Sequence, residues 1–347
     1  MLTKATLLTA LSLSLLANAA DADPPKSRQS AAGKDTPLPL LTLRGHAGRV
    51  SCVRYSPNGK QLATGSADGT AALWDPQTGR RLLTLRGHPK GVRAVSFSPD
   101  GSRLATAGWE GDVRVWDAKA GRPLLALPGG LLNVVAVAFD PREGGLTTAE
   151  CRPPEDGRIG PVQVWDARTG QRRRALGGPG SGLTALAYSP GGRWLACGEL
   201  GGRVTLWDVA GGKAAHTLGG HGGAVWGLQF SPDGRRLAAG DAGGTLLVWE
   251  VASGKAALRR GSPGETVVGV AWGPDGRRLF AAHVPGPKQG KRAGVRVWDL
   301  PTGEGRLLLE SRGGVGGLDL SPCGTRLATA HGEGTVKVWA VKELLGR

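Results

Sequence analysis

Seven tryptophans divide most of the chain into units of nearly equal length. They stand 41 to 49 residues apart, at Trp74, Trp116, Trp165, Trp207, Trp249, Trp298 and Trp339. A sequence period of this size is typical of an array in which one supersecondary unit is repeated and each copy packs on the next. The chain is therefore expected to fold as seven copies of one small unit rather than around a single continuous core.

Two further markers keep step with the tryptophans. A Ser-Pro-Asp-Gly-like turn begins at Ser56, Ser98, Ser189, Ser231, Gly273 and Ser321, and the third unit has DPREGG at Asp140 instead. A Gly-His pair stands 28 residues before the tryptophan at His46, His88 and His221. With these markers the chain resembles WD40-repeat proteins from Leu38 to about Val341. The resemblance implies an all-β fold, a seven-bladed WD40 β-propeller.

The residues of the first unit predict four short strands on their own account. These strands are expected at Arg49 to Ser56, Gln61 to Ala67, Ala71 to Asp75 and Arg81 to Arg86, with Gly-containing turns between them. Apolar side chains fall on both faces of the inner strands, which indicates a sheet covered on both sides by neighbouring blades. The 59 glycines and 23 prolines agree with many tight turns and little helix.

The ring must close, and a repeated heptapeptide suggests how it does so. LLTLRGH occurs at Leu40 and again at Leu82, where its first half forms the last strand of the first unit. After Trp339 too few residues remain for a fourth strand. We therefore expect residues 38–44 to supply the outer strand of the seventh blade, so that the N-terminal strand completes the last blade and leaves no open edge.

The first residues read as a targeting segment. Lys4 precedes a 13-residue apolar run, and small residues follow, which is typical of a secretory signal peptide at 1–19 with cleavage as late as Ala22. Residues 20–37 are expected to form a flexible leader and 38–347 the propeller. These features predict an exported protein of bacterial type, periplasmic or secreted, with no transmembrane segment after the signal is removed.

The resemblance implies a structural hydrogen-bond relay of His, Thr, acid and Trp within a blade. Transferred by position, it falls on His46, Thr64, Asp68 and Trp74 in the first unit. In the second it falls on His88, Thr106, Glu110 and Trp116. The fifth unit keeps His221 and Trp249 but has Gly243 and Ala239 in the places of the acid and the Thr. A structural use of these histidines is favoured over chemistry.

No motif of a catalytic, cofactor or metal site was found. The sequence has no nucleophile elbow, phosphate-binding loop or His-Glu-x-x-His helix, and its other histidines lack nearby ligands at metal-binding spacing. Four cysteines in an exported protein suggest disulfides by count, but by position only Cys151 and Cys197 are a plausible pair. We expect no enzymatic activity, no cofactor and no bound metal.

Two units of 49 residues carry extra residues between their second and third strands, at 150–161 and 283–294. Such insertions commonly lie on the binding face of a repeat array, here called the top face. Trp109, Trp226 and Arg93 are expected on the same face, although core packing is an equal alternative for each Trp. These three residues, with Lys288, Lys291 and Arg292, form the predicted partner-binding set.

The predicted function is that of a non-enzymatic protein-protein interaction scaffold. One alternative is an enzyme or ligand-binding propeller with a site in its central channel. The net charge of +16 raises another, the binding of acidic envelope polymers. Nucleic acid is disfavoured, because no basic run is interleaved with aromatic residues and the protein is expected outside the cytoplasm.

Overall fold

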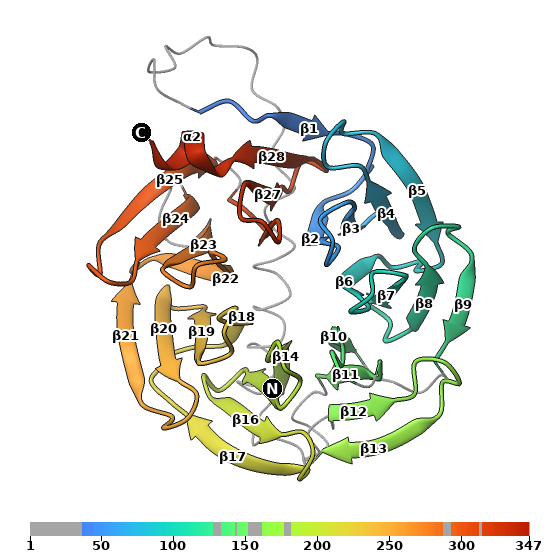
Figure 1. Ribbon diagram of the computed structural model, residues 1–347. Coiled ribbons are helices and arrows are strands. Elements are labelled where there is room, and N and C mark those ends of the chain that lie inside the picture. Colours follow the sequence, from blue (N-terminus) through green and yellow to red (C-terminus); the bar gives the residue numbers. More distant parts are fainter. Residues whose placement is uncertain are drawn as a thin grey trace, which may run out of the picture.

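Seven antiparallel sheets are arranged in a closed ring (Figure 1). The computed structural model describes residues 37–127, 133–142, 144–151, 162–176, 182–286, 293–311 and 314–346. Each sheet has four strands, and within the described residues the only helix is α2 (Val341–Leu345). The prediction of a seven-bladed all-β propeller is confirmed.

Each blade is a sheet of strands consecutive in sequence, except the last. Blade one is β2 (Val50–Tyr55), β3 (Leu62–Ser66), β4 (Thr70–Trp74) and β5 (Arg81–Arg86). Blade two is β6 (Val92–Phe97), β7 (Arg103–Gly108), β8 (Val113–Asp117) and β9 (Pro123–Ala126). Blade three is β10 (Val134–Phe139), β11 (Leu146–Glu150), β12 (Val162–Trp165) and β13 (Arg172–Leu176). Blade four is β14 (Leu183–Tyr188), β15 (Trp194–Glu199), β16 (Val204–Asp208) and β17 (Lys213–Leu218). Blade five is β18 (Val225–Phe230), β19 (Arg236–Asp241), β20 (Thr245–Glu250) and β21 (Ala256–Gly261). Blade six is β22 (Glu265–Trp272), β23 (Arg278–Pro285), β24 (Ala293–Asp299) and β25 (Gly305–Ser311). Blade seven is β26 (Gly317–Leu320), β27 (Arg326–Ala330), β28 (Val336–Ala340) and β1 (Leu41–Leu43).

The core lies between neighbouring blades rather than inside one. Every residue of β3 and β4 is buried, whereas the outermost strand β5 is mostly exposed or half-buried. One apolar cluster joins Tyr55 and Trp74 of blade one to Val338 of blade seven. Burying a Leu or Val side chain contributes about 1.5–3 kcal/mol, so each blade is stabilised mainly by its two neighbours.

The ring closes through the N-terminal strand, as predicted. Strand β1 pairs with β28 in antiparallel register, with Leu41 opposite Val338 and Leu43 opposite Val336. The strand is shorter than the predicted 38–44, because Leu38 and Leu40 remain exposed beyond the paired segment. Leu43 is 2% exposed and packs in the cluster that joins blades seven and one.

Polar side chains on the innermost strands tie some blades to the next. Asp319 of β26 accepts a hydrogen bond from the backbone N–H of Tyr55 at 2.7 Å, across the closure. Gln229 of β18 accepts in the same way from the N–H of Trp272 at 2.8 Å. Burial raises the pKa of the Asp319 carboxyl, and nearby Arg54 opposes that effect. These two side chains of the innermost strands therefore already have structural partners.

Residues 1–36 lie outside the described part of the chain, so the predicted signal peptide and most of the leader are not tested. Within the described residues, no helix combines the length and the apolar character needed to cross a membrane.

Candidate protein-interaction face

The two ends of the ring are built from different connections. The top face carries the turns between the second and third strands of each blade and the connections from one blade to the next. The bottom face carries the turns between first and second strands and between third and fourth strands. Any partner of the top face meets these turns between second and third strands, here called b–c turns, and the connections between blades.

A β-bulge recurs where the innermost strand leaves the top face. The register shifts by one residue next to Ser51, Arg93, Val135, Thr184, Trp226 and Val268. A bulge leaves its extra residue out of the pairing and redirects the side chain. Arg93 and Trp226, both predicted as partner-binding, thus occupy equivalent bulges at the inner edge of the top face, in blades two and five.

The structure brings Arg93 and Trp109 together. The guanidinium carbon of Arg93 lies 4.6 Å from the centre of the Trp109 ring, a cation–π contact. The same guanidinium donates to Oδ1 of Asn133 in blade three at 3.0 Å. Burial lowers the pKa of Arg93 to about 10, so the side chain stays charged at neutral pH. Arg93 is a cation fixed on two sides at the border of blades two and three.

The structure does not bring Trp226 to the Arg93–Trp109 pair, and it does not describe the three basic residues of the predicted set. Trp226 is half-buried in blade five, and no described contact joins it to Trp109 or Arg93. Lys288, Lys291 and Arg292 lie outside the described residues, as does most of the insertion at 150–161.

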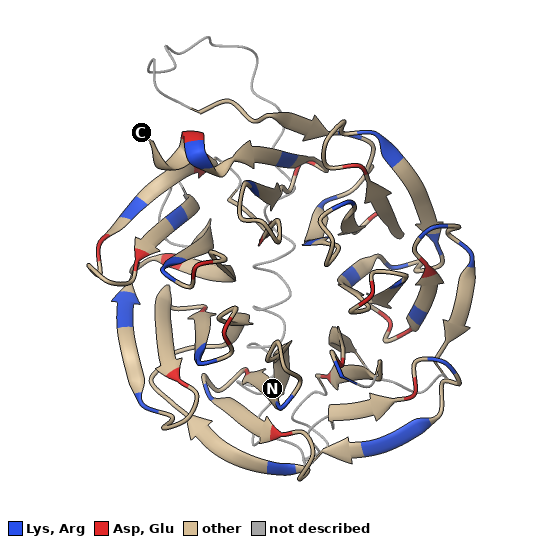
Figure 2. Ribbon diagram, in the orientation of Figure 1, with Lys and Arg blue, Asp and Glu red and all other residues tan. Residues whose placement is uncertain are grey.

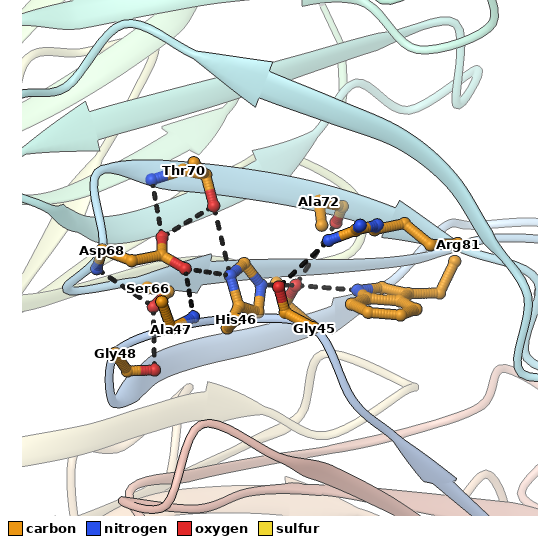
Figure 3. A network of polar contacts seen from close by, with 11 residues as sticks. Gly45, His46, Ala47, Gly48, Ser66, Asp68, Thr70, Ala72 and Arg81 are labelled. Atoms are coloured by element: carbon orange, nitrogen blue, oxygen red, sulfur yellow. Dashed lines mark hydrogen bonds and ion pairs between the residues drawn. The ribbon is translucent and has the colours of Figure 1, made fainter.

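A hydrogen-bonded chain runs beneath the top face of blade one (Figure 3). Nε1 of Trp74 donates to Oγ1 of Thr64 at 2.9 Å, and that oxygen lies 2.8 Å from Nε2 of His46. Nδ1 of His46 lies 3.0 Å from Oδ2 of Asp68. A neutral imidazole with its proton on Nδ1 therefore satisfies both neighbours.

The titration of this network favours a neutral His beside a charged Asp. Burial lowers the pKa of His46, and Asp68 opposes the shift only in part. Burial alone would raise the pKa of Asp68, but hydrogen bonds from Thr70, Ala47 and His46 outweigh it and lower the pKa to about 2. The carboxylate holds the start of the b–c turn against the incoming interblade connection.

In blade two the prediction of Glu110 as the acid of the relay is wrong. Trp116 donates to Thr106 at 2.8 Å and Thr106 contacts His88 at 2.6 Å, but the acid beside Nδ1 of His88 is Asp112. Glu110 points outward and pairs with Lys90 at 2.9 Å. Gly108 explains the exchange, because a Cβ at Gly108 would stand 2.1 Å from Oδ1 of Asp112.

Other blades place an acid below the top face from positions that the repeat pattern does not mark. Asp241, at the end of β19, lies 3.0 Å from Nδ1 of His221, so blade five has its acid even though Gly243 replaces the expected one. In blade six the order is reversed, since Glu265 begins the first strand and contacts His283 of the second at 2.9 Å. Burial lowers the pKa of His283 to about 4, and Glu265 opposes that shift. An acid at the last residue of the second strand was the available signal for Asp241.

The Trp–Thr contact recurs in four blades, whereas Cys197, Ala239 and Ala281 take the place of the Thr in blades four, five and six. The Trp Nε1 donates to Thr64, Thr106, Thr148 and Thr329. Blade four has Cys197 at this position, and Nε1 of Trp207 is buried with no hydrogen-bond partner among the described residues.

The described residues include neither a metal-binding cluster nor the disulfide considered for Cys151 and Cys197. The described parts of the chain contain no group of three His, Cys, Asp or Glu side chains that could hold a metal ion. Cys151 and Cys197 are both free thiols, so the pairing considered from the sequence is not formed. The His–acid pairs are buried behind the turns, where they fix the backbone of the top face.

Several known proteins are similar to parts of this chain. The chain is 44% identical over 61 residues to "Protein Mut11" of Chlamydomonas reinhardtii, which is 16% of either protein. It is 60% identical over 37 residues to "Notchless protein homolog" of Arabidopsis thaliana, covering 11% of this chain and 8% of that one. It is 38% identical over 72 residues to human "Serine-threonine kinase receptor-associated protein", covering 18% and 21%. The chain thus spans about a fifth or less of the length of these relatives.

The repeat itself matches a known family over more than half of the chain. The pattern of the WD domain, G-beta repeat, fits residues 38–75, 79–117, 170–208, 212–250 and 306–340. The stretches between these ranges contain the two 49-residue units with the long insertions. Together with the seven closed blades, this match shows that the chain belongs to the WD40-repeat family.

Proposed function

We propose that the chain is a non-enzymatic scaffold that binds a protein partner through its top face. WD40 propellers generally act as protein-interaction scaffolds, which supports the class of function. The observation that carries the choice of face is the cation–π pair of Arg93 and Trp109, held by Asn133. Arg and Trp are enriched among residues that dominate binding energy, and a pre-fixed pair loses little side-chain entropy on binding.

The proposal is tested by comparing the two faces of the same protein. A photo-crosslinking residue is placed at Trp226 or at exposed Lys90 on the top face, and at exposed Lys119 on the bottom face as a control. We expect one discrete adduct from the native cell with the top-face probes. We also expect Trp109→Ala with Trp226→Ala to remove the adduct of the Lys90 probe without changing the melting temperature by more than a few degrees. Adducts of equal yield from Lys119 would refute the choice of face.

The positive charge is a weaker argument for an acidic-polymer partner. Lys and Arg are distributed around the ring with Asp and Glu among them (Figure 2). Several arginines at the start of second strands already have partners: Arg103 donates to the carbonyl of Ala167, Arg236 to Glu250, and Arg326 to Gln77. Retention on an anionic matrix that is lost at moderate salt would favour the polymer alternative.

We propose further that the protein is exported, with residues 1–19 removed. The support is the positive residue, apolar run and small residues of that segment. N-terminal sequencing of the protein isolated from its own cells should start at Ala20, or at Asp23 if cleavage follows Ala22. An intact Met1 would refute export by this route.

A further inference from the structure

A groove on the bottom face lies where the ring is closed. It has a volume of about 490 Å³ and is lined by blade one residues, among them Tyr55, Lys60 and Asp75, and by Cys323 and Arg326 of blade seven. This feature, here called the seam groove, lies at the opposite end of the ring from the proposed partner face. The groove also contains an exposed thiol, that of Cys323.

Cys323 occupies a turn position that in four other blades holds a carboxylate or an amide oxygen. Asp100, Asp233 and Asn58 stand there, and each accepts from the Ser hydroxyl two residues earlier and from the backbone N–H two residues later. Asp275 accepts the same backbone bond. In these four blades the turn surrounds an acceptor oxygen, and in blade seven the sulfur of Cys323 takes its place.

The sulfur of Cys323 has contacts similar to those of the oxygen that it replaces. Its Sγ lies 3.0 Å from Oγ1 of Thr325 and 3.5 Å from Oγ of Ser321. Hydrogen bonds from Ser321 and Thr325 lower the pKa of the Cys323 thiol to about 7. The other three cysteines differ, because burial raises the pKa of Cys52 to about 11 and also raises those of Cys151 and Cys197.

A second group in the seam groove lacks a partner. Tyr55 is only 7% exposed, and its buried hydroxyl has no hydrogen-bond partner among the described residues. The equivalent Tyr188 of blade four bonds to Thr147 of blade three at 2.7 Å. Blade seven has the apolar Ala328 where blade three has Thr147, which leaves the Tyr55 hydroxyl unused. Tyr55 and Cys323 both line the seam groove.

We propose that the seam groove is a thiol-modification site, in which Cys323 exchanges with small disulfides that carry carboxylates. The Cys323 thiolate attacks one sulfur of the disulfide, the S–S bond of the reagent breaks, and the second half leaves as a thiolate. The product is a mixed disulfide on Cys323. Lys60 and Arg326 supply positive charge for the carboxylates and outnumber Asp75, and the Tyr55 hydroxyl supplies a free donor.

The experiment follows the native full-length chain with three disulfides of different charge. The reagents are 5,5′-dithiobis(2-nitrobenzoate), neutral 4,4′-dithiodipyridine and cationic cystamine, each also timed on free cysteine. We expect one fast thiol, mapped to Cys323 by mass spectrometry, with a pH–rate midpoint near 7. We expect the preference for the anionic over the cationic reagent to exceed that of free cysteine by about fivefold.

Variants separate the reactive thiol from the fold. Cys323→Asp copies the turn of blades two and five, and should remove the fast phase without lowering the melting temperature. Thr325→Val should raise the pH–rate midpoint by about one unit, since it removes one hydrogen bond to the thiolate. Tyr55→Phe copies Phe97 and Phe230, and with Lys60→Ala should slow the anionic reagent at least about twofold and leave the neutral one unchanged.

Three results would overturn the proposal. The first is a fast thiol that maps to another cysteine, or a Cys323 midpoint near 9. The second is an anionic preference no greater than that of free cysteine. The third is a covalent dimer through Cys323 as the main product in place of the mixed disulfide, which would make a second copy the partner of this thiol.

Discussion

At the scale of single residues, three blades keep a contact between a histidine and an acid, but the acid stands at a different position in each. His46 uses Asp68, two residues before the third strand, whereas His88 uses Asp112 and His221 uses Asp241. Each acid reaches the same ring nitrogen from a different backbone position. Counting residues from the tryptophan predicted the first and failed for the others. In blade two the missing side chain of Gly108 leaves room for Asp112, and in blade five the acid itself stands at the equivalent position, Asp241.

The carboxylate of Asp68 should stabilise the fold in a pH-dependent way. Its pKa in the folded protein is lowered to about 2 from an ordinary value of 3.8, so its contribution is complete above the ordinary value and is lost as pH falls through 2. Asp68→Asn should cost about 1–3 kcal/mol at pH 7 and less at pH 3. Urea unfolding at both pH values measures this. Glu110→Gln, at an exposed ion pair, should change stability by less than about 0.5 kcal/mol. A cost independent of pH would contradict the role of charge at Asp68.

The unpartnered Trp207 offers a stabilising substitution. Cys197→Thr places at this position the hydroxyl that four other blades use, and we expect a gain of about 0.5–1.5 kcal/mol when Nε1 of Trp207 acquires an acceptor. Cys197→Val is the matched control, because it has the shape of Thr without the hydroxyl. Thermal unfolding of both variants gives the comparison. Equal stability of the two would show that Nε1 of Trp207 does not need this acceptor.

At the scale of elements, turn chemistry made the strands predictable. The expected range 81–86 is reproduced by β5, and β2, β3 and β4 differ from their expected ranges by about one residue at an end. The reason is that each strand ends at a turn in which glycine is required, such as Gly59 with φ 69° and Gly79 with φ 76°. Strand β1 has no such turn before it, and its start was therefore placed three residues too early.

Closure by β1 predicts a strong asymmetry between two leucines of the same segment. Leu43 is 2% exposed and packs between blades seven and one, whereas Leu38 is 82% exposed. Leu43→Ala should lower the free energy of unfolding by about 2–5 kcal/mol, as for other buried Leu side chains. Leu38→Ala should leave it within about 0.5 kcal/mol. Chemical denaturation of both variants tests this, and equal effects would contradict closure by β1.

At the scale of the whole molecule, the repeat predicted the ring but not what distinguishes one blade from another. The spacing of the tryptophans set the number of blades, because each copy can bury its faces only on its neighbours. The contact of Arg93 with Trp109 and Asn133 could not be predicted, since it joins a bulge, a turn and a neighbouring blade. The seam groove likewise could not be predicted, because it is formed by turns of the first and last blades that lie side by side only after the ring has closed.

The shared blade should make the native seam stronger than any other place at which the ring could be opened. In the native chain the ends meet inside blade seven, where β1 hydrogen-bonds to β28. A circular permutant that joins Gly346 to Leu38 through a short flexible linker and opens the chain between Gly222 and Gly223 keeps all seven sheets. Its ends lie between two complete blades, and that interface has apolar packing and a hydrogen bond from Thr184 to the carbonyl of Val225, but no strand crosses it. We expect the permutant to keep the β-sheet circular dichroism of the parent and to melt several degrees lower, with faster amide exchange in β14 and β18. A permutant that melts with the parent would show that interblade packing alone closes the ring, and that the overlap of β1 with blade seven contributes little.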